Sequence, residues 1–593
     1  MQILSKEQKS ISTSMVLQRN YRILLSKFVR YLLPTTLTMV ALSFNGIFSS
    51  MIVANLLGSE AVGIVALGFP IIFLASAVNS LFGIGGASLY AVLLGEHQGE
   101  KAGKVLCLSL AAAFICGLFM MTAGLVFPEF FISLLCSEES LAASFSEYFR
   151  VLMLSAPLFA LVLTLLEFLP PSGSPILATI VISTANGLNL LMNYIYIAYF
   201  DMGVEGAAWG ALTGYSASIL VLVIAFWCGK TRLHVQMAYL RDLPLLWKCI
   251  STGSASAASQ LSFAIKYAFC NHLAALYGGT AGIVAFSICL QAFSLVSAFY
   301  SGIINAATPL LGVLHGEGDF SGRSHVLKTA FLYETVIVIA FVLWFEFAPE
   351  QTAAIYNITD SQESALTQAG LRIFVLAIIL RAVCITFMFY LQILQEHRYA
   401  MAISMFDGFV GIVPLAWLLC SFMGLDGLWW TYPINSVLLF VGVLLYNLHL
   451  SRKSGRYKNI FLSQKDEATE KVWDFTMTND PKDISLVSEQ LIELGKRSGL
   501  ESKSALILGL AVEEMAVYTR NHMHTKEYID ILARLYKDRI EINFRSLGES
   551  FNPLTENEGD DMINLKLIRS LAGSLKYDYV MGMNNARITL ARA

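Results

Sequence analysis

The apolar residues of this chain are concentrated in one continuous part of it. From about residue 33 to about residue 450, long hydrophobic segments follow one another, and beyond about residue 464 the sequence has the character of an ordinary soluble domain. Charged residues make up 14% of the chain, compared with about 25% in soluble globular proteins. We therefore predict a polytopic α-helical membrane protein with a soluble domain at its C-terminus.

About twelve stretches reach the length of roughly 20 mostly apolar residues that a membrane-spanning helix needs. They are 33–56, 62–90, 105–128, 149–169, 175–199, 205–228, 250–277, 281–311, 329–349, 366–394, 399–423 and 426–449. Lysine and arginine cluster before the first stretch, after the sixth and after the last, so the positive-inside rule places both termini in the cytoplasm. The nine cysteines form no CxxC pair, and neither a disulfide framework nor a metal site is expected.

Several short fragments occur twice at nearly the same offset. Gly63-Ile-Val-Ala66 recurs 219 residues later as Gly282-Ile-Val-Ala285, and residues 93–99 recur loosely as 310–318. Such an offset indicates two six-helix halves with the same orientation, and parallel repeats of this kind favour a substrate site between halves that move against each other. The chain then divides into an N-terminal arm (1–30), a first lobe (31–230), a linker loop (231–248), a second lobe (249–450), a basic linker (451–465) and a soluble tail (466–593).

Three motifs of the first half resemble one family. Leu57-Gly-Ser-Glu-Ala-Val-Gly-Ile-Val-Ala-Leu-Gly-Phe-Pro70, Leu94-Gly-Glu-His-Gln-Gly99 and Asn189-Leu-Leu-Met-Asn-Tyr-Ile-Tyr-Ile197 are similar to segments of multidrug and toxic compound extrusion (MATE) transporters. The resemblance implies a multidrug efflux transporter rather than an enzyme: an antiporter with alternating access, coupled to protons or sodium, in a bacterial inner membrane. The wider superfamily also contains flippases of lipid-linked oligosaccharides.

Ionisable residues inside membrane spans are costly and mark functional sites by default. Lys266 and Arg381 fall near the middle of the seventh and tenth spans. Glu167, Glu334 and Asp407 fall nearer the cytoplasmic ends, where their side chains are expected to turn toward water. Two fixed cations in one lobe repel a coupling cation and attract either an anionic substrate or a carboxylate of the protein. The sequence therefore leaves two roles open for Lys266 and Arg381: recognition of a small-molecule or lipid-like substrate with an anionic group, or buried pairing with an acid.

The resemblance to MATE transporters also implies acids that this chain lacks. Ser49 stands where many bacterial members carry a cation-binding aspartate in the first helix, and Asn193 replaces a later aspartate. Standard coupling to protons or sodium is therefore not expected. Polar candidates for a transport cavity, which equally suit hydrogen bonds between helices, are Asn79, Asn189, Asn193, Gln260 and Gln291.

The tail has the pattern of an α/β sandwich. Strands are expected at 472–477, 528–536, 539–544, 575–581 and 586–592, and helices around 484–494, 506–515 and 563–573. This order, with Gly509-Leu-Ala-Val-Glu-Glu-Met515, Arg545-Ser-Leu-Gly548 and Gly582-Met-Asn584, resembles the ATP-binding domains of anti-sigma-factor serine kinases in the GHKL (histidine-kinase-like) superfamily.

The chemistry that this second resemblance implies is eroded. Tyr518 stands where the magnesium-binding asparagine is expected, four residues after Glu514, and Ser546 replaces the aspartate that binds adenine. Met562 and Asn564 replace lid glycines. We therefore expect a pseudo-kinase that has lost binding of ATP and magnesium. The remnants of the nucleotide site are Glu513, Glu514, Tyr518, Gly548 and Asn584.

Three functions stay open from the sequence. The first is a MATE-like exporter whose tail regulates it. The second is a membrane sensor that signals through its anti-sigma-like tail. The third is a flippase of an anionic lipid-linked precursor, which Lys266 and Arg381 would attract. The expected partners are the lipid bilayer, a small-molecule or lipid-like substrate and a cytoplasmic regulatory protein bound by residues 466–593, without nucleic acid.

Overall fold

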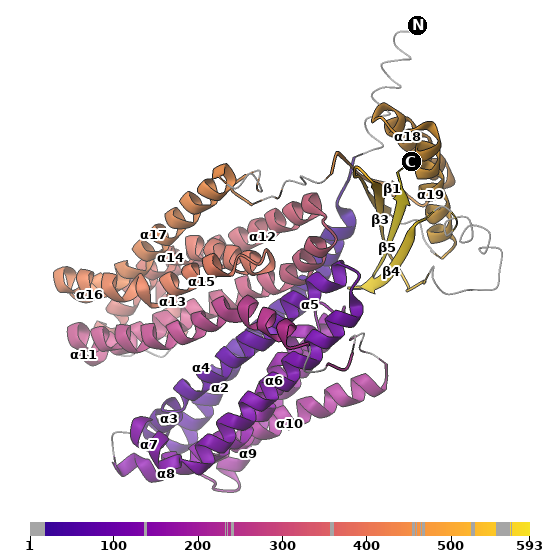
Figure 1. Cartoon of the computed structure of the whole chain (residues 1–593). Coiled ribbons are helices and arrows are strands. Elements are labelled where there is room, and N and C mark those ends of the chain that lie inside the picture. Colours follow the sequence, from indigo (N-terminus) through magenta and orange to yellow (C-terminus); the bar gives the residue numbers. More distant parts are fainter. Residues whose placement is uncertain are drawn as a thin grey trace.

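Two groups of long helices and a small sheet make up the computed structural model of this chain (Figure 1). It describes residues 18–135, 139–229, 242–355, 361–453, 469–522, 528–552 and 572–592, with isolated positions in the gaps between them. The helices converge beside the sheet and diverge at the opposite end. We call these two ends of the bundle the sheet-side end and the far end.

The first lobe begins with a helix of 36 residues and continues through shorter, bent segments. Ser80–Ile84 is a π-helical turn between two α-helical segments of a single span, Ala61–Gly95. The elements are α2 (Arg22–Leu57), α3 (Ser59–Ala66), α4 (Phe69–Asn79), η1 (Ser80–Ile84), α5 (Gly85–Gly95), α6 (Gly99–Val126), α7 (Pro128–Leu135), α8 (Glu139–Phe168), α9 (Pro175–Ala198) and α10 (Glu205–Trp227).

The second lobe repeats this plan. Its elements are α11 (Leu243–Gly316), α12 (Phe320–Phe347), α13 (Pro349–Ile355), α14 (Ser361–Ile393), α15 (His397–Met405), η3 (Phe406–Val410), α16 (Ile412–Met423) and α17 (Leu425–Lys453). The 74 residues of α11 are interrupted at Gly279, whose φ of 57° and ψ of −150° are not helical. A straight helix of that length would extend about 110 Å, against about 30 Å for a hydrocarbon core. α11 therefore provides two spans.

Among the described residues, eleven helical segments are long and apolar enough to cross a membrane. Counting the two arms of α11 separately gives the twelve spans predicted from the sequence. The protein is therefore a polytopic helical membrane protein, as the hydrophobic pattern indicates.

Strands in the described part of the tail form one antiparallel sheet in the order β1-β2-β3-β5-β4. Each predicted strand is present within a few residues, whereas the helix predicted at 563–573 lies almost entirely outside the described residues. The elements are β1 (Lys471–Thr478), α18 (Pro481–Arg497), α19 (Ser502–Asn521), β2 (Tyr528–Leu535), β3 (Arg539–Leu547), β4 (Ser574–Val580) and β5 (Met583–Ala591).

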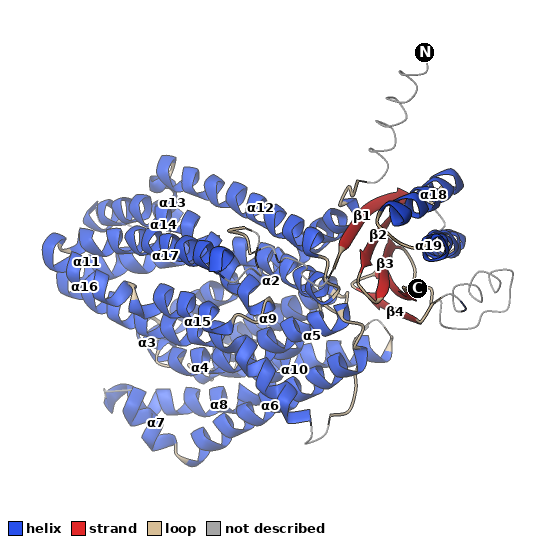
Figure 2. Cartoon of the chain, turned by 45° about the horizontal axis from the view of Figure 1, so that its top comes forward, coloured by secondary structure: helices blue, strands red, loops and turns tan. Residues whose placement is uncertain are grey.

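The two faces of this sheet differ in chemistry because side chains alternate along each strand. One face packs against α18 and α19 and is apolar, with Ile531, Ile542 and Ile588 in its core. Figures 1 and 2 show the sheet between these two helices and the membrane bundle. The opposite face, turned toward the bundle, is polar and charged, and includes Asp474, Asp530, Arg534, Asn543, Arg545 and Arg587.

Candidate functional site

Three charged side chains from three elements meet inside the second lobe. The guanidinium of Arg381 (α14) donates to the carboxylate of Asp407 (η3), with both Nε–Oδ1 and Nη2–Oδ2 at 2.9 Å. The Nζ of Lys266 (α11) donates to the backbone carbonyl of Asp407 at 3.3 Å and lies 3.9 Å from its Oδ2. These three side chains are 14% exposed or less. We call them the charged triad, and with two cations and one anion it carries an excess positive charge.

A close contact between elements brings the charged triad together. A Cβ on Gly408 would collide with the side chain of Ser262, so glycine is what allows η3 to approach α11 this closely. Asp407 directly precedes this glycine, and Lys266 lies one helical turn beyond Ser262. π-Helical turns such as η3 are frequent at functional sites.

Aromatic groups surround the two cations. The Arg381 guanidinium lies 5.0 Å from the centre of the Phe293 ring, and its Nη1 donates to the Tyr300 hydroxyl. The Lys266 ammonium lies 5.5 Å from the centre of the Phe263 ring. Ring faces attract cations electrostatically, so these contacts add to the interactions that hold both side chains in place.

The positions of Glu334 and Asp407 differ from the prediction that they turn toward water. Both are enclosed by protein, with 1% and 2% of their surface exposed. Glu334 accepts a hydrogen bond from the Thr386 hydroxyl at 3.0 Å, and Asp407 belongs to the charged triad. The prediction was wrong because each carboxylate has a buried partner on a neighbouring helix, which hydropathy alone does not reveal.

The corresponding polar group of the first lobe is neutral. The side-chain nitrogen of Asn193 (α9) donates to the Ser49 hydroxyl (α2) at 2.9 Å. These are the two positions where the resemblance to MATE transporters implies acids. Backbone atoms of Asn189 and Asn193 would lie about 3 Å from a Cβ on Gly210, so α9 and α10 pack at backbone contact. The side-chain oxygens of both asparagines are buried without a described hydrogen-bond partner.

The remaining membrane candidates lie apart from these two groups in the described hydrogen-bond network. Asn79 ends α4 next to η1, and its buried side-chain oxygen has no described partner. Gln260 and Gln291 lie on opposite arms of α11 and are half-buried. Among the described residues, no cluster of three or more His, Cys, Asp or Glu side chains could hold a metal ion.

A second polar cluster joins the tail to the second lobe. The loop Glu317–Asp319 between α11 and α12, here the second-lobe loop, reaches the charged face of the sheet. Arg545 donates to both acids of this loop, with Nη2–Oδ2 3.2 Å for Asp319. Arg19, just before α2, binds Asp319 through both Nη atoms at 2.8 and 2.7 Å. The Glu317 carbonyl accepts from Arg534 at 2.7 Å.

The acidic side chains of this cluster share the guanidinium groups of Arg19 and Arg545. Burial by itself would raise the pKa of Asp319, but the guanidiniums of Arg19 and Arg545 outweigh burial and lower it. Asp474 also contacts Arg19, at 3.1 Å, yet burial and the nearby charge of Asp319 raise its pKa. Burial would lower the pKa of Arg19, and its three carboxylate neighbours, Asp319 first, raise it well above the ordinary value.

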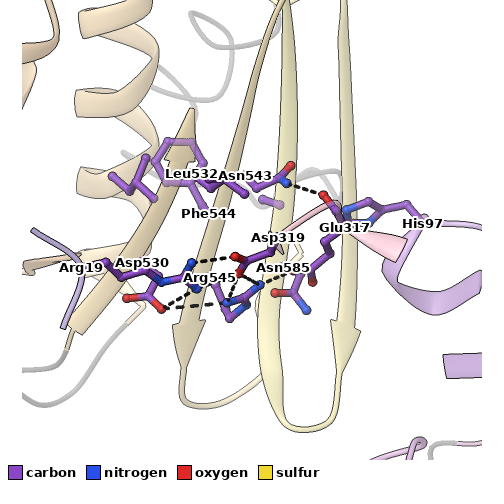
Figure 3. Close-up of a pocket in the computed structure, with 12 residues that line it drawn as sticks. Arg19, His97, Glu317, Asp319, Asp530, Leu532, Asn543, Phe544, Arg545 and Asn585 are labelled. Atoms are coloured by element: carbon purple, nitrogen blue, oxygen red, sulfur yellow. Dashed lines mark hydrogen bonds and ion pairs between the residues drawn. The ribbon is translucent and has the colours of Figure 1, made fainter. Parts of the chain in front are cut away.

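The first lobe contacts the same sheet through the equivalent loop. This first-lobe loop, Glu96–Gln98 between α5 and α6, places Nδ1 of His97 2.6 Å from Oδ2 of Asp578 in β4. Arg587 donates to the Gly95 carbonyl at 3.4 Å. The two loops and the charged face of the sheet together form what we call the bridging interface (Figure 3). It encloses a cavity of about 10 Å³, about the room of one water, so it is a packed contact.

The tail residues that the sequence analysis predicts as remnants of a nucleotide site lie partly together, around an aromatic cluster. The Tyr518 ring is buried, 5.7 Å from the Phe551 ring centre to centre. Asn584 accepts from the Phe551 amide at 3.2 Å and from the Tyr577 hydroxyl at 2.6 Å, and burial raises the pKa of Tyr577 to about 12. Asn584 and Tyr518 are thus joined through Phe551.

The other remnants occupy the edges of this cluster. Glu514 lies one helical turn before Tyr518 on α19, and burial together with the charge of Glu513 raises its pKa. Gly548 follows β3 with a φ of 116°, and its carbonyl accepts from the Tyr579 hydroxyl at 2.7 Å. Met562 and Asn564 lie outside the described residues.

The sequence placed His97 and Arg545 in motifs of other kinds and did not predict the bridging interface that they help to form. Its available signal was the alternation along Arg539–Arg545, in which every second residue is charged or an amide although the strand is buried. A strand with one solvent-exposed face has the same alternation. The pattern alone therefore does not distinguish a face exposed to solvent from a face that packs against another part of the protein.

A duplicated bundle of spanning helices, with a polar group inside each half, defines a polytopic membrane transporter built from two lobes. The model of the MatE family matches residues 34–195 and 255–418, one segment in each lobe. These segments cover more than half of the chain, and the chain therefore belongs to the MatE family, whose members are transporters rather than enzymes.

Known relatives and structures agree with this membership. Multidrug export protein MepA of Staphylococcus saprophyticus is 22% identical over 401 residues, which are 68% of this chain and 88% of the relative. MepA of Staphylococcus aureus is 22% identical over 419 residues, 70% of this chain and 92% of the relative.

Solved structures of the same fold also match. An outward-facing multidrug resistance MATE family transporter of the MOP superfamily matches with a TM-score of 0.66 and 23% identity, over 72% of this chain and 96% of that chain. A MOP superfamily transporter from Pyrococcus furiosus, for which a reverse polarity of the binding pocket is described, matches with a TM-score of 0.66 and 23% identity, over 72% of this chain and 95% of that chain.

Proposed function

We propose that this protein exports small organic solutes from a bacterial cytoplasm by secondary-active alternating access between its two lobes. The relatives named as multidrug export proteins support transport out of the cell and a broad range of substrates. The basic residues in the last turn of α17, Arg452 and Lys453, support a cytoplasmic sheet-side end, with both termini inside.

The observation that carries the proposed substrate class is the contrast between the two polar groups in the membrane. The first lobe has the uncharged pair Asn193–Ser49, and the charged triad of the second lobe has an excess positive charge. A site of this polarity attracts anionic groups and repels coupling cations. We therefore propose substrates with a carboxylate, sulfonate or phosphate group, and a mode of coupling that differs from a carboxylate-bound cation.

Counterflow of labelled substrates in proteoliposomes tests this proposal. The panel contains cationic, anionic and lipid-like compounds, and we expect transport of anionic ones. Lys266→Met removes the excess charge while leaving the Arg381–Asp407 pair, and should reduce anion transport at least tenfold. Lys104→Met is the matched control, because Lys104 pairs with Asp242 at 3.2 Å in another part of the chain. Transport of cations alone, insensitive to Lys266→Met, would contradict the proposal.

The charged triad also favours a second candidate, a flippase of an anionic lipid-linked precursor. Such a substrate has a diphosphate headgroup that the excess charge would attract, and a chain that stays in the bilayer. The lipid-like arm of the panel separates the candidates: a flippase moves the labelled lipid and ignores soluble anions. Lys266→Glu should then abolish lipid translocation, whereas unchanged translocation would exclude a role for this site.

For the tail we propose a regulatory domain derived from a histidine-kinase-like ATPase that no longer binds nucleotide. The supporting observation is the aromatic cluster of Tyr518, Phe551 and Tyr577, which fills the space between α19 and the remnants at Gly548 and Asn584. Rings packed in this way leave little room for an adenine.

Calorimetry of the full chain with ATP and ADP, with and without magnesium, tests the nucleotide part. We expect no binding to the wild type. Tyr518→Ala removes the buried ring and is measured in parallel with the wild type. Its control is Leu506→Ala, an exposed position on the same helix. Saturable binding by the wild-type chain would show that the site is intact and would overturn this part of the proposal.

A further inference from the structure

The tail contacts both lobes at equivalent positions of the internal repeat. The first-lobe loop lies within residues 93–99 and the second-lobe loop within the related segment 310–318 and the residue after it. His97 meets Asp578 in β4, and Asp319 meets Arg545 in β3. One rigid sheet therefore spans the junction between two bodies that, in the proposed function, must move apart.

The lobes themselves touch closely beneath this sheet. A Cβ on Gly95 would collide with the Val313 carbonyl, and a Cβ on Gly316 would collide with the Val92 carbonyl. The ends of α5 and α11 thus pack backbone to backbone at the sheet-side end, while Figure 1 shows the two helix groups diverging toward the far end. The sheet is docked on a closed end.

A hairpin of the tail adds an apolar contact. β4 and β5 are joined by Met581 and Gly582, with φ values of 55° and 71°, both positive as in a two-residue type I′ turn. Met581 is 1% exposed and belongs to the same apolar core as the membrane helices, and Lys27 of α2 donates to the Gly582 carbonyl at 2.8 Å. The backbone of Met581 also lies beside Gly173, between α8 and α9.

We propose that the tail is an intramolecular latch: its sheet and the Met581–Gly582 hairpin hold the sheet-side ends of the two lobes together, so that opening toward the cytoplasm requires the tail to leave one lobe. This inference rests on the proposed alternating-access function. It assigns the regulatory role of the tail to the bridging interface and to the step in which the sheet-side end opens toward the cytoplasm.

The latch opens at the first lobe. The second-lobe loop is held by buried ion pairs with Arg19 and Arg545, and breaking such pairs leaves uncompensated charges. The first lobe is held by the His97–Asp578 pair, by the Met581 side chain and by three hydrogen bonds: Lys27 to the Gly582 carbonyl, Arg22 of α2 to the Tyr528 hydroxyl at 2.6 Å, and Arg587 to the Gly95 carbonyl. These hydrogen bonds have neutral acceptors, so fewer opposite charges are separated when this side opens, and the tail stays with the second lobe.

Hydrogen–deuterium exchange of the full chain in lipid nanodiscs tests the latch without a substrate. The variant His97→Gly/Met581→Lys removes the histidine pair and places a second cation beside Lys27. Arg497→Ala is the matched control, because Arg497 forms an exposed pair with Glu493 on α18. Unchanged exchange in β2 and α19 shows that the tail remains folded.

We expect the double variant to accelerate amide exchange at least tenfold in the first-lobe loop and at the ends of α5 and α11, while Arg497→Ala behaves as wild type. Faster exchange in the loop with unchanged α5 and α11 would overturn the latch, because the lobes would then stay closed without the tail. Unchanged exchange everywhere would also overturn it, because these contacts would not hold the tail.

Transport measurements on the same variants separate the latch from the exporter. A latch predicts at least threefold faster counterflow for the double variant, and a wild-type rate despite released lobes would overturn it. If exchange accelerates as expected but no compound in the panel moves through any variant, the exporter proposal fails while the conformational role of the tail stands.

Discussion

The two lobes share one architecture but differ in how they satisfy polar groups inside the membrane. The first lobe joins two neutral side chains, Asn193 and Ser49, and the second joins Lys266, Arg381 and Asp407. The same difference recurs outside the membrane, where a single histidine holds the first-lobe loop and buried ion pairs hold the second.

This difference indicates that duplication did not keep the lobes mechanically equal. A hydrogen bond between neutral groups contributes about 1 kcal/mol, whereas breaking a buried ion pair costs about 3–5 kcal/mol. The second lobe, together with the docked tail, therefore forms the stiffer part of the molecule. In the proposed latch, the first lobe is the part that moves against it.

The largest effect is expected from Asp407→Asn. It leaves Lys266 and Arg381 buried without a carboxylate and should reduce stability by about 3–5 kcal/mol. Thermal unfolding in detergent measures this loss. A melting temperature shifted no further than that of Asn193→Ala would contradict the comparison between the lobes.

Asp319→Ala should have the next largest effect, confined to the tail. Arg19 and Arg545 lose their shared partner but keep Asp530 nearby, so we expect about 2–3 kcal/mol, at or below the lower end of the range for buried pairs. Amide exchange in β2 and β3 should rise, while exchange in α14 stays unchanged. A global change in exchange would show that the tail and the membrane body do not unfold separately.

Asn193→Ala and Ser49→Ala should each cost about 1 kcal/mol, because each removes one neutral hydrogen bond. The double variant should cost less than the sum, since both changes remove the same interaction. Additive losses of stability would mean that this hydrogen bond contributes nothing to the first lobe.

The smallest effect is a pH dependence of docking that comes from Asp474. Its pKa is raised in the docked tail, so protonation favours docking, and docking strengthens as the pH falls from 7 through this raised pKa toward the ordinary value of 3.8. The lowered pKa of Asp319 contributes no change over this range, because its contribution is lost only at lower pH. Protection of the β1 amides, taken as the exchange rate relative to the intrinsic rate at each pH, should increase on acidification in wild type and not in Asp474→Asn; an equal increase in both would assign it to another group.

Much of the membrane fold could be predicted from the sequence, because a span must be continuously apolar and a duplication leaves residues at a fixed offset. The positions of Lys266 and Arg381 at mid-membrane also follow from counting. Their partner Asp407 could not be predicted by counting, because it lies 141 residues from Lys266. The direction of its side chain is set by a π-helical turn that breaks the regular helical period.

The tail shows a different limit of sequence reasoning. Its strands and helices follow from periodicity, and Tyr518 and Asn584 were predicted as parts of one site. Arg545 was assigned only to a motif of that site, whereas in the structure its side chain points away from the helices and binds the second-lobe loop. A strand pattern defines two faces but does not identify what covers each of them.

Arg19 has a consequence for how the chain is made. A ribosome synthesises this residue before all of its carboxylate partners, Asp319, Asp474 and Asp530. At 5–20 residues per second the last partner emerges about half a minute or more afterwards. A chain that terminates before residue 319 contains none of these partners, and one that terminates before residue 474 contains only Asp319. The arginine therefore reaches its full set of ion pairs only in a chain that has been synthesised through Asp530.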